Sequence, residues 1–194
     1  MLIFSALSAI ANCVAAPFYG TYLNNELGFT LLFISVIGIA NVVVRCVVSI
    51  FMGKYADRKS FSSMLNICFI FAVFSYAVMV FAVPKNGAVI YTLYMAVFVA
   101  IYQAGYGNGI MNLTYDSVSH DERIMAYALF SAISGVVGFI TTLAGSFIVR
   151  KIQENGNTVF GVNIYAQQFL SLIAVIFTII GVIYLNLAIK KKKS

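Results

Sequence analysis

Gly53-Lys54-Tyr55-Ala56-Asp57-Arg58-Lys59 is the stretch that organises this chain, because it concentrates charge between two long apolar segments. Only 9% of the 194 residues are charged, whereas 62% are hydrophobic. The apolar segment 31–52 precedes the charged stretch, and the apolar segment 63–83 follows it. Two segments of this length joined by a charged connection are typical of a helical hairpin that crosses a bilayer twice. We therefore expect a charged hairpin loop between two membrane helices.

The composition of the whole chain extends this interpretation. A mean hydropathy of +0.97 would leave a soluble domain with too little polar surface. A spanning helix needs about 20 apolar residues, so the chain has room for about six spans. No alternation typical of a barrel is present, and no connection is long enough for a separate domain. We predict an all-α integral membrane bundle, with residues 1–194 as one domain and spans at 2–23, 31–52, 63–83, 88–113, 124–149 and 169–189.

The basic residues predict the orientation of the bundle. The net charge is +6, but four of the twelve basic residues are Lys190 to Lys193 and the others lie mostly at segment ends. This distribution follows the positive-inside rule and does not indicate nucleic acid binding. Lys54, Arg58 and Lys59 lie on the same side as the tail, whereas the pair at 150–151 opposes this assignment. We expect a protein of the cytoplasmic membrane with both termini in the cytoplasm.

The charged stretch also resembles a known signature. Gly53, Asp57 and Arg58 match the G-x-x-x-D-R motif that the major facilitator superfamily carries between the second and third helices of each six-helix half. The family pattern continues with a glycine and two basic residues, where this chain has Ser60-Phe61-Ser62. The resemblance implies that these three residues hold one conformation of a transport cycle. Asp116, at the same predicted side, is added as a partner by location alone. A loop that only sets topology is the alternative.

The likeness covers almost the whole chain. Six spans with both ends inside resemble one half of a twelve-helix transporter. Ala16-Pro17-Phe18-Tyr19, Asn112-Leu113-Thr114-Tyr115-Asp116 and the short tail are similar to the carboxy-terminal half of solute exporters. The resemblance implies secondary active transport of a small solute by alternating access, together with an amino-terminal half or a second copy. The competing hypothesis is a truncated or half-size membrane protein that binds a partner and transports nothing.

Polar residues inside the apolar spans indicate where a solute would pass. Polar groups at membrane depth are costly unless they face protein or a water-filled cavity. Ser5, Ser8, Asn12 and Tyr19 form a stripe on the first span, and three glycines and several polar residues share the fourth. In the superfamily these two helices line the central cavity. The expected solute contacts are Asn12, Gln103, Tyr106 and Asn108, although hydrogen bonds between helices explain each residue equally well.

Arg45 is the one formal charge well inside a predicted span. It precedes the expected end of its helix at Met52 by seven residues, or about 10 Å. There it either binds an anionic group of the solute or extends toward the membrane interface. The carboxylates all lie at segment ends or in connections, so this chain offers no proton carrier at mid-membrane depth.

Several function classes find no support in the sequence. The three cysteines lie in apolar segments without a C-x-x-C spacing, and no metal cluster, nucleotide motif or pair of nucleophile and base is recognisable. We therefore expect a protein that is not an enzyme and that needs neither a cofactor nor a metal. A stripe of small residues on the fifth span predicts close helix packing, with a sliding surface as the alternative.

Overall fold

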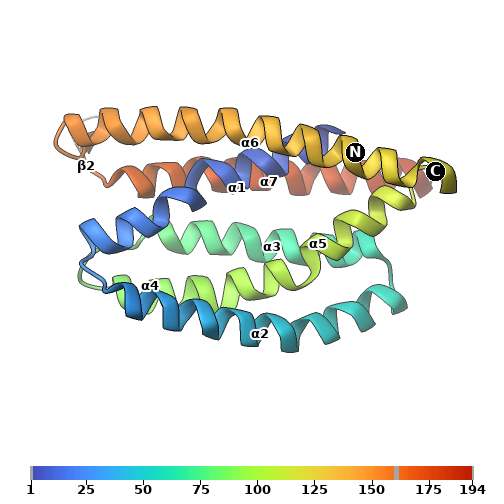
Figure 1. Cartoon of the computed structure of the whole chain (residues 1–194), viewed down its shortest axis with the longest axis horizontal. Coiled ribbons are helices and arrows are strands. Elements are labelled where there is room, and N and C mark those ends of the chain that lie inside the picture. The colour runs from blue at the N-terminus through green and yellow to red at the C-terminus, as the bar shows by residue number, and fades with distance from the viewer. Residues whose placement is uncertain (1, 160–161, 194) are drawn as a thin grey trace.

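The computed structural model describes residues 2–159 and 162–193 and shows six long helical spans (Figure 1). All six are long and apolar enough to cross a membrane, which confirms the predicted all-α membrane bundle. A short hairpin of two strands precedes the last span. The elements are α1 (Leu2–Thr21) with η1 (Tyr22–Glu26), α2 (Leu31–Arg58), α3 (Phe61–Val80), α4 (Gly87–Leu93) with η2 (Tyr94–Val99) and α5 (Ala100–Tyr115) in one span, η3 (His120–Glu122), α6 (Arg123–Glu154), β1 (Thr158–Val159), β2 (Val162–Asn163) and α7 (Ala166–Lys193).

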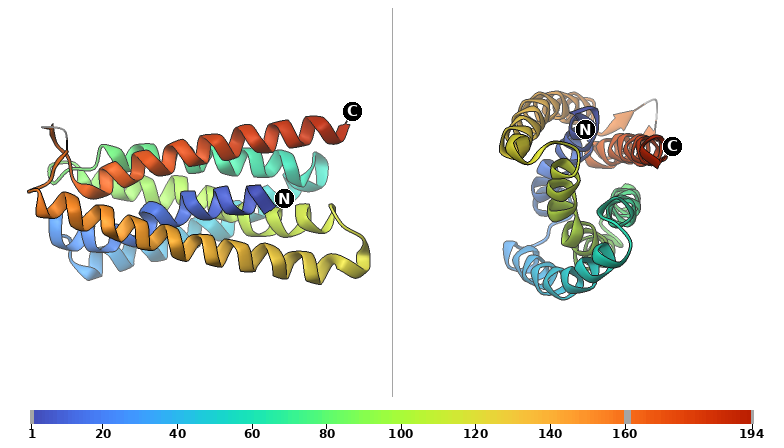
Figure 2. Two further views of the ribbon diagram at one scale, coloured as in Figure 1. Left: turned by 90° about the horizontal axis from the view of Figure 1, so that it is seen from above. Right: turned by 90° about the vertical axis from the view of Figure 1, so that its right-hand side faces the viewer.

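The spans form two layers when the bundle is viewed end-on (Figure 2). One layer follows an arc from α6 through α1 and α5 to α2, and the other contains α7 and α3. α1 packs mainly on α6 and α7, whereas α3 packs on α7 and α5. In the most apolar window of each span, 44% of the residues of α1 and α3 are buried, but only 6% in α2 and 11% in α6. The two ends of the arc therefore carry apolar surface that this chain leaves uncovered.

The charged motif does not form the expected hairpin loop. α2 continues through Arg58, because the Lys59 backbone N–H still donates to the Tyr55 carbonyl at 3.0 Å. The turn itself is only Lys59 and Ser60, and the Ser60 hydroxyl accepts from the Ser63 backbone N–H at 3.1 Å to cap α3. The predicted end at Met52 was wrong because hydropathy falls where a helix leaves the apolar layer, while its backbone hydrogen bonds continue.

Both ends of the chain lie toward one end of the bundle, together with the α2–α3 and α5–α6 turns (Figure 1). The connections between α1 and α2 and between α3 and α4, and the β1–β2 hairpin, lie at the opposite end. Four spans separate the α2–α3 turn from the C-terminal tail, and an even number of spans returns the chain to the same end of the bundle. Which end faces the cytoplasm stays a prediction.

Small residues let α6 approach α1 closely. A Cβ on Gly145 would lie 3.0 Å from the Val14 carbonyl oxygen, and one on Gly138 would lie 2.9 Å from the Cys13 sulfur. Thr142 also donates from its hydroxyl to the Cys13 carbonyl at 3.2 Å. The predicted packing role is confirmed for this part of the stripe, whereas its other members are exposed, namely Ala128, Ala132 and Gly135.

The span α4–η2–α5 contains a π-helical segment opposite α2. The Asn41 side chain, which is buried on α2, donates to the Met95 carbonyl within η2. A π-helical turn disturbs the regular ladder of backbone hydrogen bonds, so a side-chain donor from a neighbour stabilises it. This contact holds α2 against the same span that supplies the residues of the candidate site.

Candidate functional site

A pocket of about 280 Å³ lies between α2 and α5. It contains three of the five residues that the sequence predicted to contact a solute, namely Arg45, Gln103 and Asn108. Its lining residues are Arg45, Cys46 and Ser49 from α2 and Gln103, Ala104, Gly107 and Asn108 from α5. The structure thus brings together residues from two different spans that sequence spacing alone could not connect.

Arg45 and Gln103 join the two walls of this pocket. The Arg45 Nη1 donates to the Gln103 Oε1 at 3.3 Å, and both side chains are exposed. The Ser49 hydroxyl is already used, since it donates to the Cys46 carbonyl at 2.8 Å. The Asn108 amide group makes no hydrogen bond with another described side chain. The pocket therefore offers a positive charge and two amide groups with unused hydrogen-bonding capacity.

Arg45 lies deep in its span. Lys54 is the first charged residue toward the motif end of α2, nine residues or about 14 Å from Arg45 at the helical rise. That distance is about half of the ~30 Å hydrocarbon thickness of a bilayer. The Arg45 side chain bonds across the pocket to α5. This geometry favours a role in the pocket over extension toward the membrane interface.

The other two predicted contact residues belong to a separate cluster inside the bundle. Asn12 Oδ1 accepts from the hydroxyls of Tyr76 at 3.1 Å and Tyr102 at 3.0 Å, and Asn12 Nδ2 donates to the Ser8 carbonyl at 2.7 Å. The Tyr106 hydroxyl donates to Ser8 Oγ at 3.2 Å. We call Ser8, Asn12, Tyr76, Tyr102 and Tyr106 the Asn12 network. It joins α1, α3 and α5.

The Asn12 network satisfies its own polar groups in this conformation. Both acceptor positions of the Asn12 carbonyl oxygen are occupied. The Tyr102 and Tyr106 rings lie 4.9 Å apart, and each also contacts Phe69. Sequence analysis missed Tyr76, because a tyrosine in an apolar span carries no signal of its hydrogen-bond partner. This cluster holds three spans together inside the bundle, whereas Arg45, Gln103 and Asn108 of the pocket are exposed.

The three glycines of α5 have two different roles. A Cβ on Gly105 would lie 2.7 Å from the Cys68 sulfur, and one on Gly109 would lie 2.8 Å from the Leu65 Cγ. These two glycines permit the close approach of α3. A Cβ on Gly107 would meet nothing within 4 Å, because Gly107 lines the pocket. Gly107 therefore gives the pocket room on the side of α5 away from α3.

The predicted gating residues lie at the motif end of the bundle. Gly53, Asp57 and Arg58 are exposed in the last turns of α2, and a Cβ on Gly53 would meet nothing within 4 Å. No other element of the described residues therefore packs closely against Gly53. Asp116 is exposed at the C-terminal end of α5. Their gating role stays a prediction.

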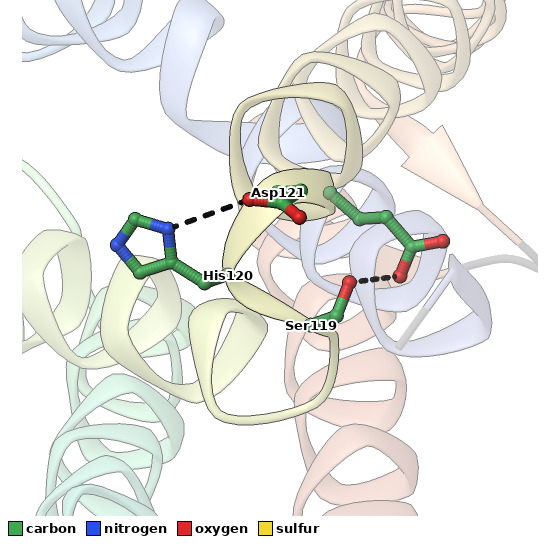
Figure 3. Close-up of polar contacts among 4 residues, drawn as sticks. Ser119, His120 and Asp121 are labelled. Atoms are coloured by element: carbon green, nitrogen blue, oxygen red, sulfur yellow. Dashed lines mark hydrogen bonds and ion pairs between the residues drawn. The ribbon is translucent and has the colours of Figure 1, made fainter.

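The polar turn between α5 and α6 is exposed at the same end. Ser119 Oγ donates to Glu122 Oε2 at 2.7 Å, and His120 Nδ1 lies 3.8 Å from Asp121 Oδ1 (Figure 3). The His120 side chain is 86% exposed, so this contact is solvated and weak.

Comparison with known proteins identifies a family for the chain. The family model described as Major Facilitator Superfamily matches residues 1–193. No curated protein and no solved structure matches the chain.

Proposed function

The chain belongs to the major facilitator superfamily of membrane transporters, and from that premise we propose that it forms one half of a twelve-helix secondary transporter. This half moves a small solute across the cytoplasmic membrane by alternating access. Residues 1–194 act as a single six-helix domain, and the other half is an amino-terminal six-helix segment or a second copy. Both termini face the cytoplasm in this proposal.

The exposed arc is the observation that carries the proposal. α6, α1, α5 and α2 lie along one side of the bundle, and α2 and α6 at its ends are almost unburied (Figure 2). The pocket with Arg45, Gln103 and Asn108 lies between two members of this arc. A second half placed against the arc would cover apolar surface at both ends and enclose the polar pocket between them. Such an arrangement gives a solute site near the middle of the membrane.

The gating residues fit the same arrangement. Gly53, Asp57 and Arg58 end α2 at the rim of the arc, and their exposed surface is available to the second half. Because a Cβ on Gly53 would meet none of the described residues within 4 Å, the space beside it can accept a helix end from outside. Closing and opening of that contact would change access to the pocket from this side. Asp116, at the neighbouring end of α5, lies on the same side of the bundle.

The proposal is tested by access to Gln103 from each side of the membrane. The complete protein carries the single cysteine of Gln103→Cys after replacement of its native cysteines, and it is placed in right-side-out and inside-out vesicles. A charged, membrane-impermeant thiol reagent is then added outside. We expect labelling in both preparations, since alternating access exposes the pocket to each side in turn. The matched control is Ile183→Cys, on the outer helix α7, where the side chain is also exposed in the isolated half.

Two outcomes would contradict the proposal. Labelling of Gln103→Cys as slow as that of Ile183→Cys in both preparations would mean that no aqueous path reaches the pocket. Labelling from one side alone would mean a fixed cavity, which suits a partner-binding bundle better than a transporter.

A further inference from the structure

The pocket between α2 and α5 holds a positive charge that no described residue neutralises. Arg45 donates to the neutral oxygen of Gln103, and no carboxylate of the described residues pairs with it. The six carboxylates of the chain lie at Glu26, Asp57, Asp116, Asp121, Glu122 and Glu154, all at helix ends or in connections. An ionised side chain at mid-membrane depth is costly and is usually retained for a partner of opposite charge.

The donors in the pocket match an oxyanion. A guanidinium presents five N–H groups in a planar fork that suits carboxylates and phosphates, and Arg45 uses one of them on Gln103. The Gln103 and Asn108 amides add N–H donors from α5, on the opposite wall. Two acceptors nearby are already engaged, because Gln103 Oε1 accepts from Arg45 and the Cys46 carbonyl accepts from Ser49, which leaves Asn108 Oδ1 as the unengaged side-chain amide oxygen of the pocket. The free groups are thus mainly donors.

The space in the pocket agrees with its chemistry. The pocket volume of about 280 Å³ is at the lower end of the usual range for small-molecule sites. Gly107 leaves the α5 wall without a side chain, so a bound group can approach the backbone. The room suits a compact charged group together with a small part of the solute attached to it.

We propose that this pocket binds an oxyanion, a carboxylate or phosphate group, carried by the transported solute. Arg45 supplies the charge and the fork, while Gln103 orients the guanidinium and, with Asn108, donates to the anion. This inference rests on the proposed transport function and names its substrate class. The same chemistry could come from a carboxylate side chain of the second half, and the experiment separates the two sources.

Cys46 provides a native reporter, because it is exposed and lines the pocket beside Arg45. The complete protein is purified with its other cysteines replaced, and Cys46 is reacted with anionic, cationic and neutral thiol reagents of similar size. We expect Arg45→Gln to slow the anionic reagent and to speed the cationic one, each by about tenfold. A tenfold change corresponds to about 1.4 kcal/mol of electrostatic interaction with the lost unit charge.

Acetate and inorganic phosphate serve as probes of binding. At matched ionic strength, with chloride as the reference anion, we expect one or both to slow the neutral reagent at Cys46 in the unmodified protein. Arg45→Gln should abolish this protection, and Arg45→Lys should weaken it because lysine lacks the planar fork. If the second half already supplies a carboxylate, the unmodified protein will show neither protection nor a preference for the anionic reagent, and the proposal is overturned.

A second variant guards against a failure of Arg45→Gln to fold. Gly107→Val fills the pocket but leaves the charge in place, so protection by the probes should disappear while the reagent preference at Cys46 remains. Gly135→Val is the matched control, because a Cβ there also meets nothing within 4 Å but lies on α6. Protection that survives in Gly107→Val would overturn the assignment of the site.

Failure of this inference can be told apart from failure of the proposed function. Access to Gln103 from both sides without anion protection removes the oxyanion site alone. Anion protection with access to Gln103 from one side only removes alternating access and leaves an anion-binding protein.

Discussion

Replacement of Asn12 by leucine should destabilise the bundle because it removes the acceptor shared by Tyr76 and Tyr102. Leucine has a similar volume and adds no polar group, so the main loss is hydrogen bonding. A side-chain hydrogen bond between membrane helices contributes about 0.6 kcal/mol on average and at most about 1.7 kcal/mol. Two such bonds give an expected loss of about 1 to 3 kcal/mol in the free energy of unfolding.

The buried thiol of Cys68 can report this loss, since the chain contains no tryptophan. The fraction of protein that reacts with a thiol-sensitive dye is measured against denaturing detergent, with Cys13 and Cys46 replaced. Asn112→Leu is the matched control, because its amide donates only to the backbone carbonyl of Asn108, within its own helix. We expect the control to lose about 0.5 kcal/mol or less, as a substitution away from packed interfaces does.

A mutant cycle tests the physical reason for the effect. In a background with Tyr76→Phe and Tyr102→Phe, the hydroxyls that need the acceptor are absent, so Asn12→Leu should cost much less than in the unmodified protein. An equal cost in both backgrounds would refute the argument, because the loss would then come from packing of the leucine. A cost for Asn12→Leu no larger than that for Asn112→Leu would refute it as well.

Three further predictions concern close approach and the motif. Gly105→Ala should lower the free energy of unfolding by about 1 to 3 kcal/mol, because its Cβ would lie 2.7 Å from the Cys68 sulfur, whereas Gly107→Ala should be close to neutral in the same detergent titration. Gly145→Ala should lower the free energy of unfolding by about as much as Gly105→Ala, since its Cβ would lie 3.0 Å from the Val14 carbonyl oxygen of α1. A neutral result would contradict tight α1–α6 packing. Asp57→Asn should lower the initial rate of solute uptake or efflux in proteoliposomes while the amount of inserted protein is unchanged, and an unaltered rate would exclude a gating role.

The number and order of the spans could be predicted because each needs about 20 apolar residues, a requirement that composition alone reveals. The ends of the spans could not. α2 was expected to end at Met52, but it continues to Arg58, because the backbone of Lys54 and its neighbours stays helical outside the apolar layer. Hydropathy reports where the membrane ends, and backbone hydrogen bonds report where the helix ends. The motif was therefore assigned to a loop although it is helical.

The candidate site was predictable in its residue types but not in its grouping. Arg45, Gln103 and Asn108 stand out as polar residues in apolar spans, and the structure places all three in one pocket. Asn12 and Tyr106 carried the same signal, yet they belong to the Asn12 network. Which polar residues face a pocket and which bond to one another depends on the rotation of each helix, and single-sequence periodicity does not fix rotation when both faces are largely apolar.

The Asn12 network and the pocket are connected through α5. Tyr102 and Gln103 are neighbours in sequence, so their side chains leave the helix about 100° apart. Tyr102 is held by Asn12 of α1, whereas Gln103 bonds to Arg45 of α2. The network on one face of α5 thus fixes the rotation that places Gln103 and Gly107 on the pocket wall. Because Asn12 acts from inside the bundle, its contribution to solute binding would be one of position, whereas in the proposed site Arg45 would supply the charge that contacts the solute.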